Sequence, residues 1–369
     1  MTIPRFRAII PAGGAGTRLW PLSRRSSPKF LTDVTGSGRS LLQATWDRLS
    51  PLTGPHGIVV VAGQAHNEAI AQQLPADCEI FTEPAGRDSM AAIGLAAAVL
   101  YQREGDVVVG SFAADHLIPD ATAFAQSVSQ AVAAAQAGFV VTLGMRPSRP
   151  ATGFGYIRVG NSLQGVAGAD GLAGAFLATA FKEKPDAATA SAYLQTGNYR
   201  WNAGMFISRA KVLLDALARF CPDLHAGLIE IAAAWDTPQR QAVLAERWLS
   251  LPRIAIDHAI AEPLASQNGV AVVPAEFAWD DVGDWHSVAG LVEPQADNVR
   301  RLGQAGPVWA EQADGLLVAS TTGRPVAVVG IPDAVVVDTG DALLVTTRQA
   351  AQQVKTVVDR IAVDHSQLL

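Results

Sequence analysis

Short apolar runs alternate with amphipathic stretches along the first part of the chain. Runs rich in β-branched and other apolar residues predict buried strands at 6–10, 58–62, 79–81, 106–110 and 139–144. The stretches at 40–49, 64–73, 89–101 and 121–137 are typical of helices, and Ser40 is a typical N-cap residue. Strands that alternate with helices predict a mostly parallel sheet covered on both faces, with ligands at the carboxyl ends of the strands.

The pattern becomes less regular and then changes. Helices are predicted at 211–219, at 222–248 with a break at Thr237-Pro238, and at 256–262. From about residue 291 onward, short β-branched runs separated by turns follow one another at 316–319, 326–329, 334–337 and 342–346, and a closing helix is predicted at 349–363. We therefore expect an α/β domain at 1–292 and a smaller β-rich domain at 293–369.

Composition narrows the function class. The 369 residues include 49% hydrophobic residues, which is enough for a large core, and the net charge of -6 argues against a nucleic-acid surface. The longest apolar run, 90–100, is too short to cross a membrane, and residues 1–7 do not form an apolar signal region. Cys78 and Cys221 lie far apart without metal-type spacing, so we expect free thiols in a reducing cytoplasm.

A glycine-rich loop with two cations follows the first predicted strand. Its sequence is Gly13-Gly14-Ala15-Gly16-Thr17-Arg18, and Lys29 comes shortly afterwards. Glycines let backbone N–H groups surround an anion, and the two cations fit a triphosphate. The alternative interpretation is a tight turn with incidental basic residues. The Walker pattern is excluded because Gly-Lys-Ser/Thr does not follow, and the glycine spacing excludes a dinucleotide fingerprint.

The whole stretch resembles the signature of the sugar-nucleotide pyrophosphorylases, Gly-Gly-x-Gly-Thr-Arg-Leu-x-Pro-Leu-Thr/Ser followed by Pro-Lys. Trp20 before Pro21 is similar to the mannose-1-phosphate guanylyltransferase branch, whereas Pro11 replaces the usual Leu and Phe30 replaces the usual Gln. The resemblance implies a Rossmann-like nucleotidyltransferase domain with a mixed, mostly parallel sheet. It also implies a small C-terminal β-rich domain similar to a left-handed β-helix.

The resemblance assigns the nucleotide side of the site. Arg18 and Lys29 would act on the phosphates during catalysis, and Glu83 would accept hydrogen bonds from N1–H and N2–H of guanine. Asp88, Ser89 and Met90 depart from the usual Asn-Thr-Ala, which bears on the choice of base. The nucleotide-binding residues implied by the resemblance are Ala12, Gly13, Gly14, Gly16, Thr17, Glu83, Pro84 and Arg87.

The resemblance also assigns the sugar-phosphate side, to Gly153, Gly155, Glu183, Lys184 and Asn202. A carboxylate such as Glu183 accepts hydrogen bonds from two hydroxyls, and the Lys184 ammonium pairs with a phosphate. A solvated charged turn is the alternative for the Lys-Glu-Lys run at 182–184.

Two aspartates are the expected metal ligands. Asp115 precedes His116 in an Asp-His pair that is similar to the family's pre-catalytic element, with Ala114 in place of Ser, and Asp281 matches the second metal-binding position. Mg²⁺ prefers one or two carboxylates together with phosphate oxygens. An Asp that caps a turn is the alternative for Asp115, and Asp280 and Asp284 are competing neighbours of Asp281.

Taken together, the resemblance implies transfer of GMP from GTP to α-D-mannose 1-phosphate with Mg²⁺, in a cytoplasmic homodimer without a nucleic-acid or membrane partner. Other interpretations remain open at this point. One is another sugar-1-phosphate nucleotidyltransferase, using UTP or dTTP with glucose 1-phosphate, or GTP with a heptose 1-phosphate. Another is a non-catalytic regulatory homologue that binds sugar nucleotides. The glycine spacing sets aside a NAD-binding oxidoreductase.

Overall fold

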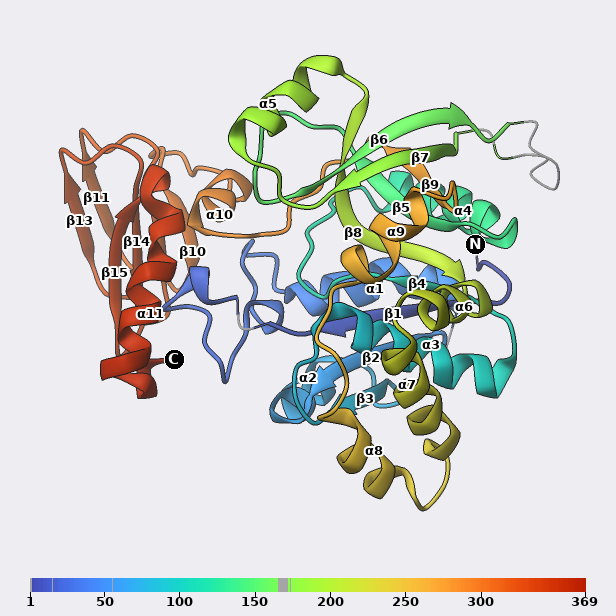
Figure 1. The fold of residues 1–369 in the computed structure, drawn as a ribbon. Coiled ribbons are helices and arrows are strands. Elements are labelled where there is room, and N and C mark those ends of the chain that lie inside the picture. The colour runs from blue at the N-terminus through green and yellow to red at the C-terminus, as the bar shows by residue number, and fades with distance from the viewer. Residues whose placement is uncertain (1, 15, 55, 165–171, 173) are drawn as a thin grey trace.

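The computed structural model describes residues 2–14, 16–54, 56–164, 172 and 174–369. Its larger part is built on a nine-stranded sheet in the order β3-β2-β1-β4-β8-β5-β9-β7-β6 (Figure 1). The strands are β1 (Phe6–Ala12), β2 (Ile58–Gly63), β3 (Glu79–Glu83), β4 (Val108–Ser111), β5 (Val140–Met145), β6 (Gly155–Ser162), β7 (Phe176–Lys182), β8 (Tyr199–Arg209) and β9 (Val270–Ala275).

The sheet is mixed. Strands β1 to β4 are parallel neighbours, and β5 is parallel to β9. The long strand β8 lies antiparallel between β4 and β5, and β6 and β7 form an antiparallel extension. The carboxyl ends of the parallel strands β1, β3 and β4 therefore lie at one edge of the sheet. On the other side of β8, the first residues of β6 pair with β8, with Gly155 opposite Asn202.

Helices cover both faces because each central strand buries both of its sides. In β1, Phe6, Ala8 and Ile10 pack with α1, α2 and α4, whereas Ile9 packs with α3, α6 and α7. The helices are α1 (Leu41–Thr53), α2 (Asn67–Gln73), α3 (Asp88–Glu104), α4 (Ala121–Gln136), α5 (Ala187–Thr196), α6 (Ala210–Phe220), α7 (Pro222–Ala234), α8 (Arg240–Trp248) and α9 (Glu262–Ala265). None of the helices that the structure describes has the length and apolar character needed to span a bilayer.

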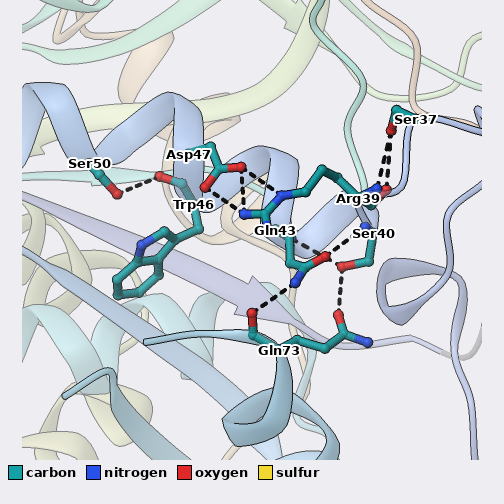
Figure 2. A network of polar contacts seen from close by, with 8 residues as sticks. All are labelled: Ser37, Arg39, Ser40, Gln43, Trp46, Asp47, Ser50 and Gln73. Atoms are coloured by element: carbon teal, nitrogen blue, oxygen red, sulfur yellow. Dashed lines mark hydrogen bonds and ion pairs between the residues drawn. The ribbon is translucent and has the colours of Figure 1, made fainter. Parts of the chain in front are cut away.

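The predicted N-cap of α1 is confirmed, and its hydrogen bonds also position the segment that carries Lys29. Ser40 accepts from the Gln43 N–H at 3.2 Å, and Gln43 Oε1 accepts from the Ser40 N–H at 3.0 Å, which is a capping box (Figure 2). Ser40 Oγ donates to Gln73 Oε1 at 2.6 Å, and Gln73 Nε2 donates to the Leu31 carbonyl at 3.0 Å. The cap thus ties α1 and α2 to the 3-10 turn Lys29–Leu31.

The C-terminal part is a stack of short parallel strands. Strands β10, β12 and β14 pair in register, with Arg300 opposite Leu317 and Leu317 opposite Val335, and β11 pairs with β13. Apolar side chains between the two sheets form a small core, and β15 adds an antiparallel edge. The strands are β10 (Arg300–Gly303), β11 (Val308–Glu311), β12 (Leu317–Ser320), β13 (Val326–Val329), β14 (Ala334–Asp338) and β15 (Leu343–Thr347).

The C-terminal end of the chain packs against the loop that follows β1. Helix α10 (Trp285–Leu291) leads into the C-terminal unit, and α11 (Val354–Asp364) packs with Leu19 and Trp20 from the loop after β1. The indole of Trp20 donates to the Leu368 carbonyl at 3.0 Å. Figure 1 shows the N-terminal loop, in blue, reaching out to α11. The predicted α/β domain and the predicted β-rich C-terminal unit are both confirmed, while the closing helix begins later than predicted, after a 3-10 turn at Arg348–Gln353.

Candidate functional site

Two hollows open beside the edge where the strands of the α/β domain end. The first, which we call the glycine hollow, has a volume of 430 Å³, which is within the usual range for a small-molecule site. It is lined by Gly13, Gly14, Glu83, Gly86, Asp115 and Arg253, among others. The second, the basic hollow, measures 710 Å³ and is lined by Arg18, Arg149, Gly153, Lys184, Asp281 and Gln352, among others.

Lys29 links the two hollows. Its ammonium lies 2.8 Å from Oδ2 of Asp115, which lines the glycine hollow. The same ammonium donates to the carbonyl of Asp281 at 2.7 Å, and Asp281 lines the basic hollow. The Lys29 ammonium therefore joins the carboxylate of Asp115 to the main chain at Asp281, the two aspartates that the sequence singled out.

The end of the glycine loop fits around Lys29. Gly16 has a φ of 57°, in the left-handed region that favours glycine, and a Cβ placed there would lie 2.5 Å from Lys29 Cγ. Thr17 and Arg18 then form a 3-10 turn, Thr17–Leu19. Ala12 is fully buried at the end of β1, so it contributes backbone rather than side-chain surface.

Asp281 lies in a constrained loop. Val282 is buried with a φ of 49°, which is strained for a β-branched residue. Asp280 accepts from the Val282 N–H at 2.6 Å, and Asp284 accepts from the Ser287 N–H at 3.0 Å to cap α10. The pKa of Asp281 is raised to about 6, mainly by burial; the Lys29 charge lowers it, and the charges of Asp280 and Asp115 contribute to the rise.

Glu83 ends β3 and is only 8% exposed, and burial raises its pKa to about 7.

Arg87 does not point into the glycine hollow as expected for a nucleotide-binding residue. Its guanidinium donates to the carbonyls of Trp248 (3.1 Å) and Leu249, so it holds the end of α8. Pro84 lines a neighbouring depression, and Arg253 is the cation that lines the glycine hollow.

Glu183 and Lys184 follow β7 and form an ion pair of 2.8 Å. Hydrogen bonding to Glu183 raises the pKa of Lys184, so the ammonium stays charged. A Cβ at Gly155 would lie 2.5 Å from Glu183 Oε2, so this glycine lets β6 approach the carboxylate. Gly153 precedes β6 and lines the basic hollow with Lys184.

Asn202 is held in a fixed orientation inside β8. Its Oδ1 accepts from Thr142 Oγ1 at 2.9 Å and from the Gly204 N–H at 3.1 Å. Its Nδ2 donates to Asp257 Oδ1 at 2.7 Å. Burial raises the pKa of Asp257 to about 6, and the charge of Glu183 adds to the effect, so the two carboxylates lie near one another.

Sequence reasoning missed several residues of this region. Asp257 was included in a predicted helix, although a carboxylate in an apolar stretch was a usable signal. The segment is a π-helical turn, Asp257–Ala261, a form that occurs often at functional sites. Arg149, Arg253 and Gln352 line the hollows from distant parts of the chain, and nothing in their local sequence marked them. Within the described part of the chain, His, Cys, Asp and Glu side chains do not gather in threes as a metal-binding group.

Comparison with known families gives two matches along the chain. The nucleotidyl transferase family matches residues 7–295. The "MannoseP isomerase/GMP-like beta-helix domain" family matches residues 312–361.

Relatives extend over nearly the whole chain. Xanthan biosynthesis protein XanB of Xanthomonas campestris pv. campestris is 38% identical over 361 residues, covering 96% of this chain and 72% of that protein. Mannose-1-phosphate guanylyltransferase of Escherichia coli strain K12 is 37% identical over 373 residues, covering 99% and 75%. A crystal structure from Thermus thermophilus, described as a mannose-1-phosphate geranyltransferase, superposes with a TM-score of 0.83 at 32% identity, covering 97% of this chain and 99% of that one. The chain therefore belongs to the nucleotidyl transferase family, together with the mannose-1-phosphate guanylyltransferases that it resembles along nearly its whole length.

Proposed function

We propose that the protein transfers GMP from GTP to α-D-mannose 1-phosphate, giving GDP-mannose and pyrophosphate. The observation that carries the proposal is the position of Lys29, which contacts Asp115 of the glycine hollow and Asp281 of the basic hollow. Two phosphorylated substrates in these hollows would meet at that ammonium. Relatives named mannose-1-phosphate guanylyltransferase, 35 to 37% identical over nearly the whole chain, support this pair of substrates.

The reaction needs charge neutralisation more than proton transfer. A phosphate oxygen of mannose 1-phosphate attacks the α-phosphorus of GTP in line, the new P–O bond forms, and the bond to pyrophosphate breaks. Because the nucleophile is already an anion and the leaving group departs as one, a general base is not required. Arg18, Lys29 and Lys184 would lower the repulsion between the two anions and hold them in line.

The glycine hollow would hold the nucleotide. Backbone N–H groups of Gly13 and Gly14 line this hollow and are suited to the phosphates. The ionised Glu83 carboxylate is suited to the two N–H groups on one edge of guanine. Arg87 would act indirectly by fixing the end of α8. Arg253 provides an additional cation near the nucleotide.

The basic hollow would hold the sugar phosphate. Lys184 would pair with the phosphate, and Glu183 would accept hydrogen bonds from sugar hydroxyls. Gly153 is exposed and leaves its backbone accessible in this hollow, whereas Gly155 is buried and makes room for the Glu183 carboxylate. Because Thr142 and Gly204 already occupy Oδ1 of Asn202, only an N–H of its amide remains for a sugar oxygen.

Asp115 and Asp281 fit the donor set of Mg²⁺. The Asp115 carboxylate contacts the Lys29 ammonium, which also contacts the backbone carbonyl of Asp281. The charges of Lys29 and Asp115 both act on the Asp281 carboxyl, so the two carboxylates lie in one charged region. Mg²⁺ is commonly held by one or two carboxylates and completed by phosphate oxygens, which agrees with a pair rather than a larger cluster. When bound, the ion would screen the repulsion between the α-phosphate and the sugar phosphate.

We also propose the setting of this activity. We place the boundary between the catalytic and the C-terminal domain at residues 292 and 293, just after α10. Cys78 and Cys221 are free, half-buried thiols, which is compatible with the cytoplasm. We also propose a homodimer, because the C-terminal domain exposes apolar side chains such as Trp309 and Val329.

Pyrophosphate release from GTP, ATP, UTP and dTTP, each with mannose 1-phosphate or glucose 1-phosphate, tests the proposal. We expect GTP with mannose 1-phosphate to give the highest kcat/KM. A preference for UTP or dTTP would reject the base assignment, and a preference for glucose 1-phosphate would reject the sugar assignment. Failure of every pair to turn over would favour a regulatory homologue.

A further inference from the structure

The C-terminal unit contributes a side chain to the basic hollow. Gln352 belongs to the 3-10 turn Arg348–Gln353, which precedes α11, yet it lines the same hollow as Arg18, Lys184 and Asp281. The hollow is therefore shared between the α/β domain and the C-terminal unit. The proposed reaction does not assign a role to this glutamine.

Gln352 holds a buried aspartate next to the loop that carries Asp281. Its Nε2 donates to Oδ2 of Asp284, and the other oxygen of Asp284 accepts from the Ser287 N–H at 3.0 Å. Asp284 is only 6% exposed, so the loss of a partner would leave a buried carboxylate oxygen without this hydrogen bond. The glutamine thus supports the carboxylate that caps α10.

The loop at 280–284, which we call the Asp281 loop, needs such support. Val282 has a φ of 49°, and strained backbone persists only where the surroundings hold it in place. Three side chains hold this loop from different directions. Lys29 donates to the carbonyls of Asp281 and Val282, Asp280 accepts from the Val282 N–H, and Gln352 holds Asp284 at the far end.

We propose that Gln352 is a positioning residue for Asp281, through which the C-terminal unit sets the geometry of the catalytic cleft. This inference rests on the proposed function, in which Asp281 is a metal ligand. Groups that orient metal ligands are worth about 10- to 100-fold in metal affinity or activity, so the effect of Gln352 should be measurable. The unit is then part of the catalytic machinery as well as a domain that packs beside it.

Exchanging the amide and the carboxylate between Gln352 and Asp284 tests this proposal. Gln352→Glu would place a carboxylate against the carboxylate of Asp284, and the two would repel one another. In the double variant Asp284→Asn with Gln352→Glu, the new amide donates to the new carboxylate, while its oxygen still caps α10. Gln349→Ala is the matched control, because Gln349 lies on the same turn and donates to Asp333 at 3.3 Å within the C-terminal unit.

The variants are compared in the full chain by amide hydrogen exchange of residues 280–288 without substrates, and by the Mg²⁺ concentration that gives half-maximal rate. We expect Gln352→Glu to exchange faster in this segment and to need about tenfold more Mg²⁺. The double variant should return close to the parent in both measurements, and Gln349→Ala should resemble the parent.

The proposal is overturned if Gln352→Glu matches the parent in both measurements, if the double variant does not improve on it, or if Gln349→Ala has the same effect. Thermal melting of each variant separates a local change from a loss of the fold, and the double variant decides the outcome if Gln352→Glu melts early. The exchange measurement does not depend on which substrates the enzyme uses. Failure of this inference is therefore distinguishable from failure of the proposed function, which the parent's own turnover tests.

Discussion

Gly16 and Lys29 fill one small space. A Cβ at Gly16 would lie 2.5 Å from Cγ of Lys29 and 2.8 Å from its Cβ and Cδ. The φ of 57° at Gly16 is a second reason for glycine at this position. The last glycine of the loop thus determines where the lysine can lie, in addition to any contact that it makes with phosphate.

Gly16→Ala should therefore displace Lys29. We expect kcat to fall at least about tenfold, because the ammonium would leave the junction of the two hollows. The left-handed backbone would add a stability loss of roughly 1–2 kcal/mol. Gly290→Ala is the control, since that glycine lies in α10 with open space around it. Steady-state kinetics with thermal melting tests this, and a Gly16→Ala enzyme with parental kcat would show that the lysine tolerates the methyl group.

Lys29→Ala and Lys184→Ala should fail differently. Lys29 lies between Asp115 and Asp281, where charge moves during the reaction, so its removal should mainly lower kcat. Lys184 pairs with Glu183 in the basic hollow, so its removal should mainly raise KM for mannose 1-phosphate. Initial rates over a grid of both substrates separate these effects. Identical kinetic profiles would reject the division of labour.

Glu83 should make stability and function depend on pH in opposite directions. Burial raises its pKa to about 7, so its contribution to stability is complete below the ordinary pKa of 4.5 and is lost as the pH rises through 7. Glu83→Gln should therefore be more stable than the parent above pH 7, by up to about 3 kcal/mol. Denaturant unfolding between about pH 5 and pH 8.5 measures this.

The same residue should affect the choice of base. The ionised carboxylate is the form that accepts from guanine, so kcat/KM for GTP in the parent should rise as the pH passes about 7. Glu83→Gln should lose that rise together with most of the preference for GTP over ATP. An unchanged base preference would remove Glu83 from base recognition.

Much of the fold could be predicted from the sequence because its local signals agree with the tertiary structure. The N-cap at Ser40, the alternation of strands and helices, and the strands β12 to β15 are examples. Strands β10 and β11 were not predicted, since Arg300, Arg301 and Glu311 give them a polar sequence. These strands are formed by pairing with the next turn of the stack.

Part of the candidate site could likewise be predicted from the sequence, and part could not. Glycine conformations and cations within one motif were recognisable, whereas contacts between distant segments were not. Arg87 lies in a plausible motif, yet its guanidinium reaches carbonyls of Trp248 and Leu249. Asp257 reaches the site because the π-helical turn Asp257–Ala261 packs against Asn202 of β8. Gln352 reaches it because the 3-10 turn Arg348–Gln353 packs against Asp284. Such contacts follow from tertiary packing, and local sequence does not report them.

We expect the C-terminal domain to mediate self-association. Trp309 and Val329, on the paired strands β11 and β13, are 61% and 69% exposed. Exposed apolar side chains that gather in one patch mark protein–protein contacts. Trp309→Glu with Val329→Glu should shift the sedimenting species from dimer to monomer. The control is Val363→Glu, on α11, which packs against the opposite side of this unit. An unchanged dimer in the double variant would place the interface elsewhere.

Asp115 and Asp281 should behave as one unit if they share Mg²⁺. Neither would hold the ion strongly alone, because Mg²⁺ keeps its waters and needs phosphate oxygens as well. Asp115→Asn and Asp281→Asn should each lower turnover by about 10²-fold or more, and the double variant should be little worse than either. Asp280→Asn is the matched comparison, since Asp280 accepts from the Val282 N–H within the loop.

Asp281→Asn should lower turnover but raise the thermal stability of the fold. Burial raises the pKa of its carboxyl to about 6, so the charged form costs stability above that pH, and Asp281→Asn should unfold at a slightly higher temperature than the parent at about pH 8. A Mg²⁺ titration of activity in the single variants Asp115→Asn, Asp281→Asn and Asp280→Asn, beside the parent, then decides which aspartates are the metal ligands. If Asp281→Asn keeps parental turnover and Mg²⁺ dependence while Asp280→Asn loses them, Asp280 is the ligand, and the strained turn at Val282 directs that carboxylate to the cleft instead.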